Sequence, residues 1–302
     1  MKVLISGSSG FIGSALVTFL THKGHEVFKL VRKQAKYSPN EIAWDIERGE
    51  IDTQALEGIE AVIHLAGENI ATGRWTEAKK KKILDSRVLG TRLLCQALAS
   101  LKHPPQVLVS ASAIGYYGSR GKELLTEESS SGIGFLTQVC QEWESATQVA
   151  TDKGIRVGLL RMGVILSTEG GALKAMLPPF NWGLGAIIGT GDQYMSWITL
   201  DDLLKVINEI LHNHSLEGPI NAVSPNPITN RDFTKTLGQI LHRPIWLRVP
   251  DFMIRLALGE MADEMLLSSS RVEPKKLLDQ QFKFDYPSIE NALKHVLNSP
   301  KI

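Results

Sequence analysis

The 302-residue chain has only two cysteines, a net charge of +1 and no apolar run that reaches the roughly 18 residues of a membrane span. Both cysteines, Cys95 and Cys140, lie in apolar helical patterns, so we expect neither disulfides nor a metal site. The balanced charge gives no surface field that would attract nucleic acid or an anionic membrane. The start of the sequence carries no charged leader ahead of an apolar stretch, which favours a cytoplasmic location.

The first 31 residues have the pattern of a strand, a turn, a helix and a second strand. Residues 2–6 form a short aliphatic run, and residues 14–20 carry apolar side chains at helical spacing. Between them lies Gly7-Ser-Ser-Gly10-Phe-Ile-Gly13, and residues 25–31 form another apolar run. This arrangement predicts a βαβ unit with a glycine turn after its first strand.

Each glycine of this turn has a separate physical role. Gly7 permits the tight turn, Gly10 lets the backbone approach a pyrophosphate, and Gly13 lets the helix pack close to the strand. The N-terminus of the helix adds free N–H groups and positive potential. We therefore predict a dinucleotide site on this turn, formed by Gly7, Ser9, Gly10, Phe11, Ile12 and Gly13.

Two cations end the second predicted strand, where binders of NAD usually have an acidic residue. Arg32 and Lys33 suit a 2′-phosphate, so the sequence favours NADP(H) as the cofactor. The alternative is an ordinary exposed basic pair at the end of a strand.

Three further apolar runs, VIHLAG, VLVSASA and IRVGLLRMGVIL, predict more strands of the same sheet. Together these patterns predict an α/β fold, a Rossmann-type doubly wound parallel sheet with a smaller, mostly helical C-terminal lobe for a substrate. The predicted cofactor domain spans residues 1–165, and residues of about 195–222 return to it. The lobe spans residues 166–302, with Thr229 or Asn230 as the cap of one of its helices.

The glycine turn, VIHLAG and WITLDDL together resemble the extended short-chain dehydrogenase/reductase superfamily, which includes the nucleoside-diphosphate-sugar epimerases. The segments AGENI, SRVLGTRLL, SASAIGYYG and FLTQVCQEWE resemble its atypical epimerase-like subgroup more narrowly. That resemblance implies a retained cofactor site and a lost Tyr-x-x-x-Lys pair. It also suggests a homodimer.

The resemblance implies roles for several residues. Ser112 takes the place of the family's serine, which orients the reacting oxygen. The Tyr and Lys positions fall at Leu136 and Cys140, or at Phe135 and Val139 in the adjacent register. Further cofactor contacts are implied at the end of the VIHLAG strand and on the following helix, namely Leu65, Ala66, Gly67, Lys82 and Arg87. Arg161, in the strand IRVGLLRMGVIL, is a further predicted cofactor contact as an anion ligand; the alternative is a structural ion-pair partner.

Proton transfer would then need another group. Tyr116 and Tyr117 follow the serine strand, and Glu68 lies just past the VIHLAG strand. The alternatives are aromatic packing for the tyrosines and a capping carboxylate for Glu68. We predict an NADP(H)-dependent oxidoreductase or epimerase acting on a small polar molecule, with a nucleotide sugar as one candidate. The alternative is an NADP(H)-responsive binding protein without catalysis.

Overall fold

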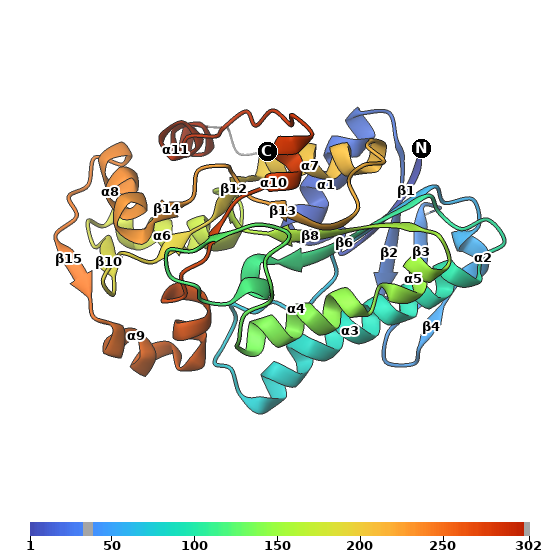
Figure 1. The fold of residues 1–302 in the computed structure, drawn as a ribbon, viewed down its shortest axis with the longest axis horizontal. Helices are drawn as coiled ribbons and strands as arrows, with labels where there is room; N and C mark the ends of the chain where they lie inside the picture. The colour runs from blue at the N-terminus through green and yellow to red at the C-terminus, as the bar shows by residue number, and fades with distance from the viewer. Residues whose placement is uncertain (33–38, 299–302) are drawn as a thin grey trace. The chain divides into compact units, whose positions relative to one another are not determined.

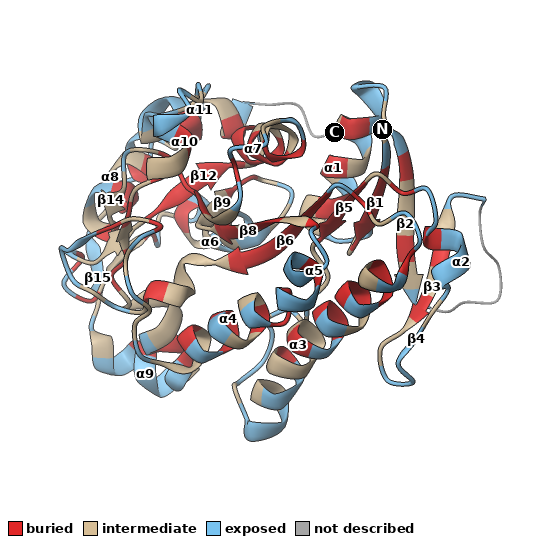
Figure 2. Ribbon diagram, turned by 45° about the vertical axis from the view of Figure 1, so that its right-hand side comes forward, coloured by how far each residue is buried: buried red, intermediate tan, exposed pale blue. Residues whose placement is uncertain are grey.

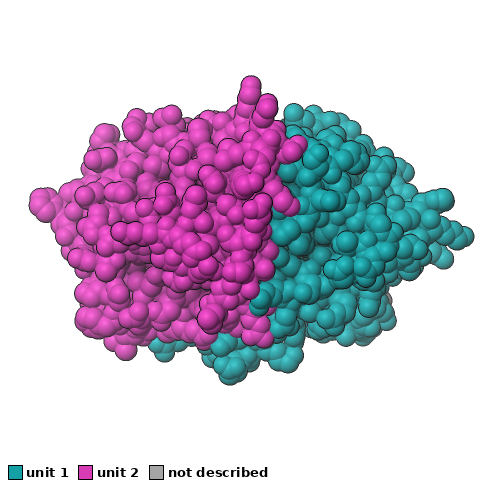
Figure 3. All heavy atoms as spheres, viewed as in Figure 1, with its two compact units in different colours: residues 1–112, 139–160, 204–220 teal, residues 113–138, 161–203, 221–302 magenta. Residues whose placement is uncertain are grey.

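The computed structural model describes residues 1–32 and 39–298, so Lys33 lies outside the described residues. Its contacts divide the chain into two compact units, coloured in Figure 3. Unit 1 comprises residues 1–112, 139–160 and 204–220, and unit 2 comprises residues 113–138, 161–203 and 221–302. The predicted boundary near residue 165 stays a prediction.

Unit 1 is built on a largely parallel sheet with the strand order β4-β3-β2-β1-β5-β6-β8-β13. Strand β1 lies between β2 and β5 and is parallel to both, so the sheet reverses its direction of winding there. In β6, β8 and β13 the last one or two residues belong to unit 2. The strands are β1 (Lys2–Ser6), β2 (Glu26–Arg32), β3 (Glu41–Asp45), β4 (Glu50–Ile51), β5 (Ala61–His64), β6 (Val107–Ala113), β8 (Arg156–Met162) and β13 (Gly218–Ala222).

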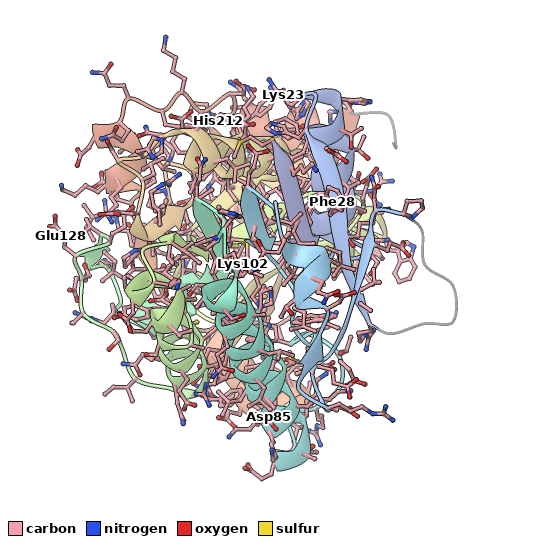
Figure 4. The ribbon with its side chains drawn as sticks, turned by 90° about the vertical axis from the view of Figure 1, so that its right-hand side faces the viewer. Lys23, Phe28, Asp85, Lys102, Glu128 and His212 are labelled. Carbon is pink, nitrogen blue, oxygen red and sulfur yellow. The ribbon has the colours of Figure 1, made fainter. Side chains whose placement is uncertain are left out.

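Helices cover both faces of this sheet. α1 (Phe11–His22) and α7 (Leu200–His212) lie on one face, and α3 (Glu77–Ser100) and α5 (Gln148–Asp152) lie on the other (Figures 1 and 2). Figure 4 shows Asp85 in the first half of α3 and Lys102 just beyond its end. A short helix, α2 (Thr53–Leu56), precedes β5.

The core of unit 1 joins the sheet to α3. Leu4, Val62 and Leu108 come from three strands, and Leu94 and Leu98 come from α3; all five are at most 1% exposed. Burying such side chains stabilises the fold by about 1.5–3 kcal/mol each. The predicted strand over residues 2–6 is confirmed, and the strand predicted over residues 25–31 is observed one residue later.

Unit 2 contains four two-stranded sheets and most of the remaining helices. Thr229 caps α8 through a hydrogen bond from the Asp232 N–H, which decides between the two predicted caps. The core of this unit includes Trp197, Phe233 and Leu293. Its strands are β7 (Leu124–Leu125), β9 (Val164–Leu166), β10 (Ala186–Ile188), β11 (Tyr194–Met195), β12 (Trp197–Thr199), β14 (Ile228–Thr229), β15 (Leu247–Val249) and β16 (Arg271–Val272). Its helices are the 3₁₀-helix η1 (Ile114–Tyr117), α6 (Gly171–Asn181), α8 (Asn230–Ile240), α9 (Asp251–Leu258), the π-helix η2 (Ala262–Leu266), α10 (Lys275–Asp279) and α11 (Ile289–Asn298).

Helix α4 (Phe135–Ser145) starts against a carboxylate of unit 2. The N–H groups of Phe135 and Leu136 donate to the two carboxylate oxygens of Glu264, at 3.0 and 3.1 Å. Gly134 precedes them with a φ of +134°, and a Cβ there would overlap this carboxylate. A negative charge at this position satisfies two N–H groups and complements the helix dipole.

Replacing Glu264 by Ala should therefore lower the free energy of unfolding by about 1–2 kcal/mol, the usual value of a helix N-terminal cap. Urea denaturation followed by circular dichroism measures this loss. Glu260→Ala, at an exposed position four residues earlier, is the matched control. Equal stabilities of the two variants would show that the carboxylate does not stabilise α4.

Candidate functional site

The glycine turn between β1 and α1 has the geometry of a phosphate-binding turn. Gly7 has a φ of +69°, and a Cβ on it would lie 3.0 Å from the Ala66 nitrogen. A Cβ on Gly13 would overlap the Gly7 carbonyl oxygen, so α1 can pack this closely on the turn only with glycine there. Gly10 is the residue before α1, and no side chain caps this helix start. The site predicted on this turn thus has backbone N–H groups that no side chain caps, at the N-terminus of α1.

A buried chain of hydrogen bonds ties this turn to the rest of unit 1. The Ser6 hydroxyl accepts from the N–H groups of Leu65 and Ala66, at 3.1 and 3.3 Å, and lies 2.6 Å from His64 Nδ1. Because these two N–H groups occupy both acceptor sites of the hydroxyl, Ser6 donates its proton to Nδ1, so the neutral imidazole carries its proton on Nε2. His64 Nε2–H then donates to Thr91 Oγ1 at 3.0 Å.

Thr91 also accepts from Trp143 Nε1, at 2.9 Å. The chain therefore links β1, β5, α3 and α4 through four side chains that are at most 5% exposed: Ser6, His64, Thr91 and Trp143. Burial lowers the pKa of His64 to about 4, so the ring stays neutral at physiological pH. None of these side chains was predicted to be functional, since each has the residue type of an ordinary core position.

Replacing Thr91 by Val should destabilise the protein by about 2 kcal/mol, because two buried donors lose their acceptor at almost constant volume. Thr91→Ser keeps the hydroxyl and should lose about half as much or less. Urea titrations of the two variants give the comparison. A Val variant as stable as the Ser variant would contradict this assignment of the hydrogen bonds.

Arg87 of α3 lies against the backbone that follows β5. Its guanidinium group donates to the carbonyl oxygens of Glu68 and Ile83, at 3.0 and 3.1 Å, and lies 5.0 Å from the centre of the Trp143 ring. A Cβ on Gly67 would lie 3.2 Å from this group. Burial lowers the pKa of Arg87. The structure thus brings the predicted residues Gly67 and Arg87 together.

Glu68 forms ion pairs with two lysines at the start of α3. Its carboxylate lies 2.8 Å from Lys79 Nζ and 3.6 Å from Lys82 Nζ. The hydrogen bond from Lys79 is the main reason that the pKa of Glu68 is lowered. A carboxylate held ionised in this way is poorly suited to donate a proton.

The end of β2 places Arg32 at an exposed position. The neighbouring β3 ends at Asp45, whose side chain accepts from the N–H groups of Glu47 and Arg48, both at 3.1 Å. Asp45 is therefore engaged in a turn. Of the two predicted cations at the end of β2, Arg32 lies within the described residues and Lys33 does not.

Ser112, near the end of β6, is only 1% exposed, and its hydroxyl donates to Glu144 Oε1 of α4 at 2.6 Å. Such a short O–H···O distance is typical of a charge-assisted bond to a carboxylate. Glu144 lies one turn beyond Cys140 and two turns beyond Leu136, so all three share one face of the helix. Glu144 was not among the residues predicted to be functional, although it continues the i, i+4 spacing of Leu136 and Cys140 by one turn.

The two candidate tyrosines and Arg161 form a cluster in unit 2. The fully buried Tyr117 donates to Asn221 Oδ1 at 2.7 Å and accepts from Arg161 Nη1 at 3.0 Å. The Arg161 guanidinium carbon lies 3.4 Å from the centre of the Tyr116 ring. Burial raises the pKa of Tyr117 to about 12. This phenol is thus held as a neutral packing and hydrogen-bonding group.

Within residues 1–32 and 39–298, no three His, Cys, Asp or Glu side chains are grouped so as to hold a metal ion. No helix in the same ranges combines the length and the apolar character that crossing a membrane requires.

The parallel sheet with its glycine turn defines a Rossmann-type fold, which confirms the predicted fold class. Residues 3–222 match the NAD dependent epimerase/dehydratase family, and the chain belongs to this family. Residues 249–296 match a domain of unknown function, DUF1731. The resemblance found in the sequence is confirmed.

Several relatives match the chain over nearly its whole length. It is 42% identical over 298 residues to an epimerase family protein of Mycobacterium bovis, which covers 99% of this chain and 98% of the relative. It is 36% identical over 305 residues to epimerase family protein YfhF of Bacillus subtilis, covering 100% of this chain and 99% of YfhF.

Two solved structures illustrate the range of similarity. A crystal structure of human epimerase family protein SDR39U1 with NADPH matches with a TM-score of 0.91 and 33% identity, covering 99% of this chain and 100% of the human chain. A UDP-glucose 4-epimerase from Thermotoga maritima matches with a TM-score of 0.76 at 18% identity, covering 98% of this chain and 97% of the epimerase. The latter similarity shows the fold alone.

Proposed function

We propose that this protein binds NADP(H) and uses it in an oxidoreductase or epimerase reaction on a small polar substrate, with a nucleotide sugar as the candidate class. The observation that carries this proposal is the glycine turn, which has an uncapped α1 start and is tied through Ser6 to the segment after β5. The NADPH complex of human SDR39U1, at 33% identity, supports the choice of cofactor.

The residues at the carboxyl edge of the sheet fit this cofactor. Gly7, Gly10 and Gly13, with the α1 N-terminus, would hold the pyrophosphate, and the neighbouring Ser9, Phe11 and Ile12 would frame it. Leu65, Ala66 and Gly67 would lie along the adenosine half. Arg32 would pair with the 2′-phosphate. Arg87 would support the segment after β5 from behind, because its guanidinium group binds carbonyl oxygens there.

For the chemical step we assign Ser112 the orientation of the reacting oxygen. The bound nicotinamide would supply or accept hydride at a carbon next to that oxygen. Glu68 is paired with Lys79, and Tyr117 is buried with a raised pKa, so neither is well suited to move the proton. The role of Tyr116 in proton transfer and those of Lys82 and Arg161 in cofactor binding stay predictions, as do a homodimer and the cytoplasmic location. One relative, from Arabidopsis thaliana, is named as chloroplastic.

A second function, an NADP(H)-responsive binding protein, is favoured by one specific observation. In neither register of the family's motif, Leu136 with Cys140 or Phe135 with Val139, does α4 carry a tyrosine and a lysine, and Cys140 and Trp143 are buried. General acid–base assistance contributes on the order of 10²–10⁴ in rate, so its loss without replacement would leave binding as the retained activity.

Mass spectrometry of a small-molecule extract, incubated with the protein and NADPH deuterated at the transferable position, separates the two functions. Deuterium in a metabolite identifies a reductase and its substrate. With unlabelled extract and NADP⁺, interconversion of isomers without net cofactor reduction identifies an epimerase. Neither change, with NADPH binding demonstrated by calorimetry, would contradict catalysis and favour the binding protein.

A further inference from the structure

The hydrogen bond between Ser112 and Glu144 joins the serine of the candidate site to a carboxylate in the last turn of α4. Ser112 lies at the carboxyl end of β6, the edge at which doubly wound sheets bind ligands. Its hydroxyl is buried and points at Glu144 Oε1, 2.6 Å away. Glu144 itself is partly exposed, so a proton that reaches it can pass on to solvent.

The same helix face has no other carboxylate, amine, imidazole or phenol at the two preceding turns. Leu136 is apolar, and Cys140 is buried beside Arg87. Two other candidate groups are engaged elsewhere, Glu68 with Lys79 and Tyr117 with Arg161 and Asn221. Glu144 is therefore the carboxylate that the fold places in direct contact with the serine hydroxyl.

We propose that Glu144 is the proton acceptor of the reaction and acts through the hydroxyl group of Ser112. This inference rests on the proposed function. In the oxidation of a substrate alcohol, the carbon loses hydride to NADP⁺ and becomes a carbonyl carbon. The alcohol proton moves to Ser112 Oγ while the proton of Ser112 moves to Glu144 Oε1, which leaves a protonated carboxyl group and a neutral serine. In the reverse reduction, Glu144 returns the proton by the same route.

A purely structural Ser112–Glu144 pair would only hold α4 against the sheet. The amide of glutamine could fill that role, because its oxygen also accepts the serine proton, whereas it cannot take a proton at neutral pH. Glu144→Gln therefore separates proton transfer from packing. Glu142→Gln, two residues earlier on the same helix, is the matched control.

The test uses the full-length protein and the substrate identified by deuterium transfer. We expect Glu144→Gln to lower kcat about 10²- to 10³-fold, with KM and the NADPH Kd changed less than about threefold. Glu144→Ala should lower kcat by a similar factor. Added formate should raise the kcat of this variant at least about tenfold, since a small carboxylate can enter the emptied space. The control Glu142→Gln should keep the wild-type kcat.

A second readout does not depend on turnover. In the protein without substrate, proton NMR should show a downfield resonance from the Ser112 hydroxyl, because short bonds to carboxylates deshield the proton. It should be lost in Ser112→Ala and move upfield in Glu144→Gln.

The outcomes are distinct. If the wild type transfers deuterium, two results would overturn the role of Glu144 alone. One is an unchanged kcat in Glu144→Gln, and the other is a lowered kcat in Glu144→Ala that formate does not restore. No transfer by the wild type, with NADPH bound, would overturn the proposed oxidoreductase function and this role with it. Loss of kcat in Glu144→Gln together with formate rescue of Glu144→Ala would establish the route.

Discussion

Arg32→Ala is expected to weaken NADPH binding about 50-fold while it changes NADH binding less than about twofold. The 2′-phosphate is the group in which the two cofactors differ, and Arg32 ends β2 at an exposed position suited to meet it. Charge-assisted hydrogen bonds to a phosphate contribute about 1.5–3 kcal/mol, which corresponds to about 10- to 150-fold in Kd. Calorimetric titration with each cofactor at one fixed salt concentration measures both constants.

Arg92→Ala, which removes an exposed arginine from α3, is the control and should leave both constants unchanged. The difference between NADPH and NADH should also shrink as salt is raised, because an exposed ion pair is screened. Equal losses for the two cofactors in Arg32→Ala would show that this cation does not read the 2′-phosphate.

Acid is expected to destabilise the protein through His64, by on the order of 3 kcal/mol once the pH has fallen below about 4. Burial lowers the pKa of His64 from 6.5 to about 4 in the folded chain. Between these two values the unfolded chain binds the proton more strongly, so stability falls as the pH is lowered. Protonation would also place a third donor against the Ser6 hydroxyl, which already accepts two N–H groups.

Urea denaturation at pH values of about 7.5, 6, 5 and 4.5 gives the slope of stability against pH. His64→Asn can keep the bond to Ser6 but cannot titrate, so it should be less stable at neutral pH and show a flatter slope. His103→Asn, at an exposed position, should keep the wild-type slope. A wild-type slope in His64→Asn would assign the acid sensitivity to other groups.

The local parts of the fold were predictable because their causes are local. The glycine turn requires a positive φ at Gly7 and close packing at Gly13, and both requirements restrict the residue type at one position. The apolar stripe of α4 was also predictable, because Val139, Cys140 and Trp143 recur at helical spacing. In the structure all three are at most 5% exposed.

The hydrogen-bonded networks were not predictable, because they join residues far apart in the sequence. Ser6 and His64 are 58 positions apart, and Ser112 and Glu144 are 32 positions apart. His64 ends a strand in which every residue is buried, so its sequence context indicated core packing alone. Trp143 fits its apolar stripe and also donates to Thr91, a double role that periodicity cannot reveal.

The bond network around Ser6 has a consequence for the kinetics of association. Ser6 holds the segment after β5 through two N–H groups, and the glycine turn follows Ser6 directly, so both cofactor-facing segments are formed before a cofactor arrives. A nucleotide entering such a site has little backbone left to order. Stopped-flow mixing should then give an observed rate that rises linearly with NADPH concentration, without the plateau that a slow rearrangement would impose.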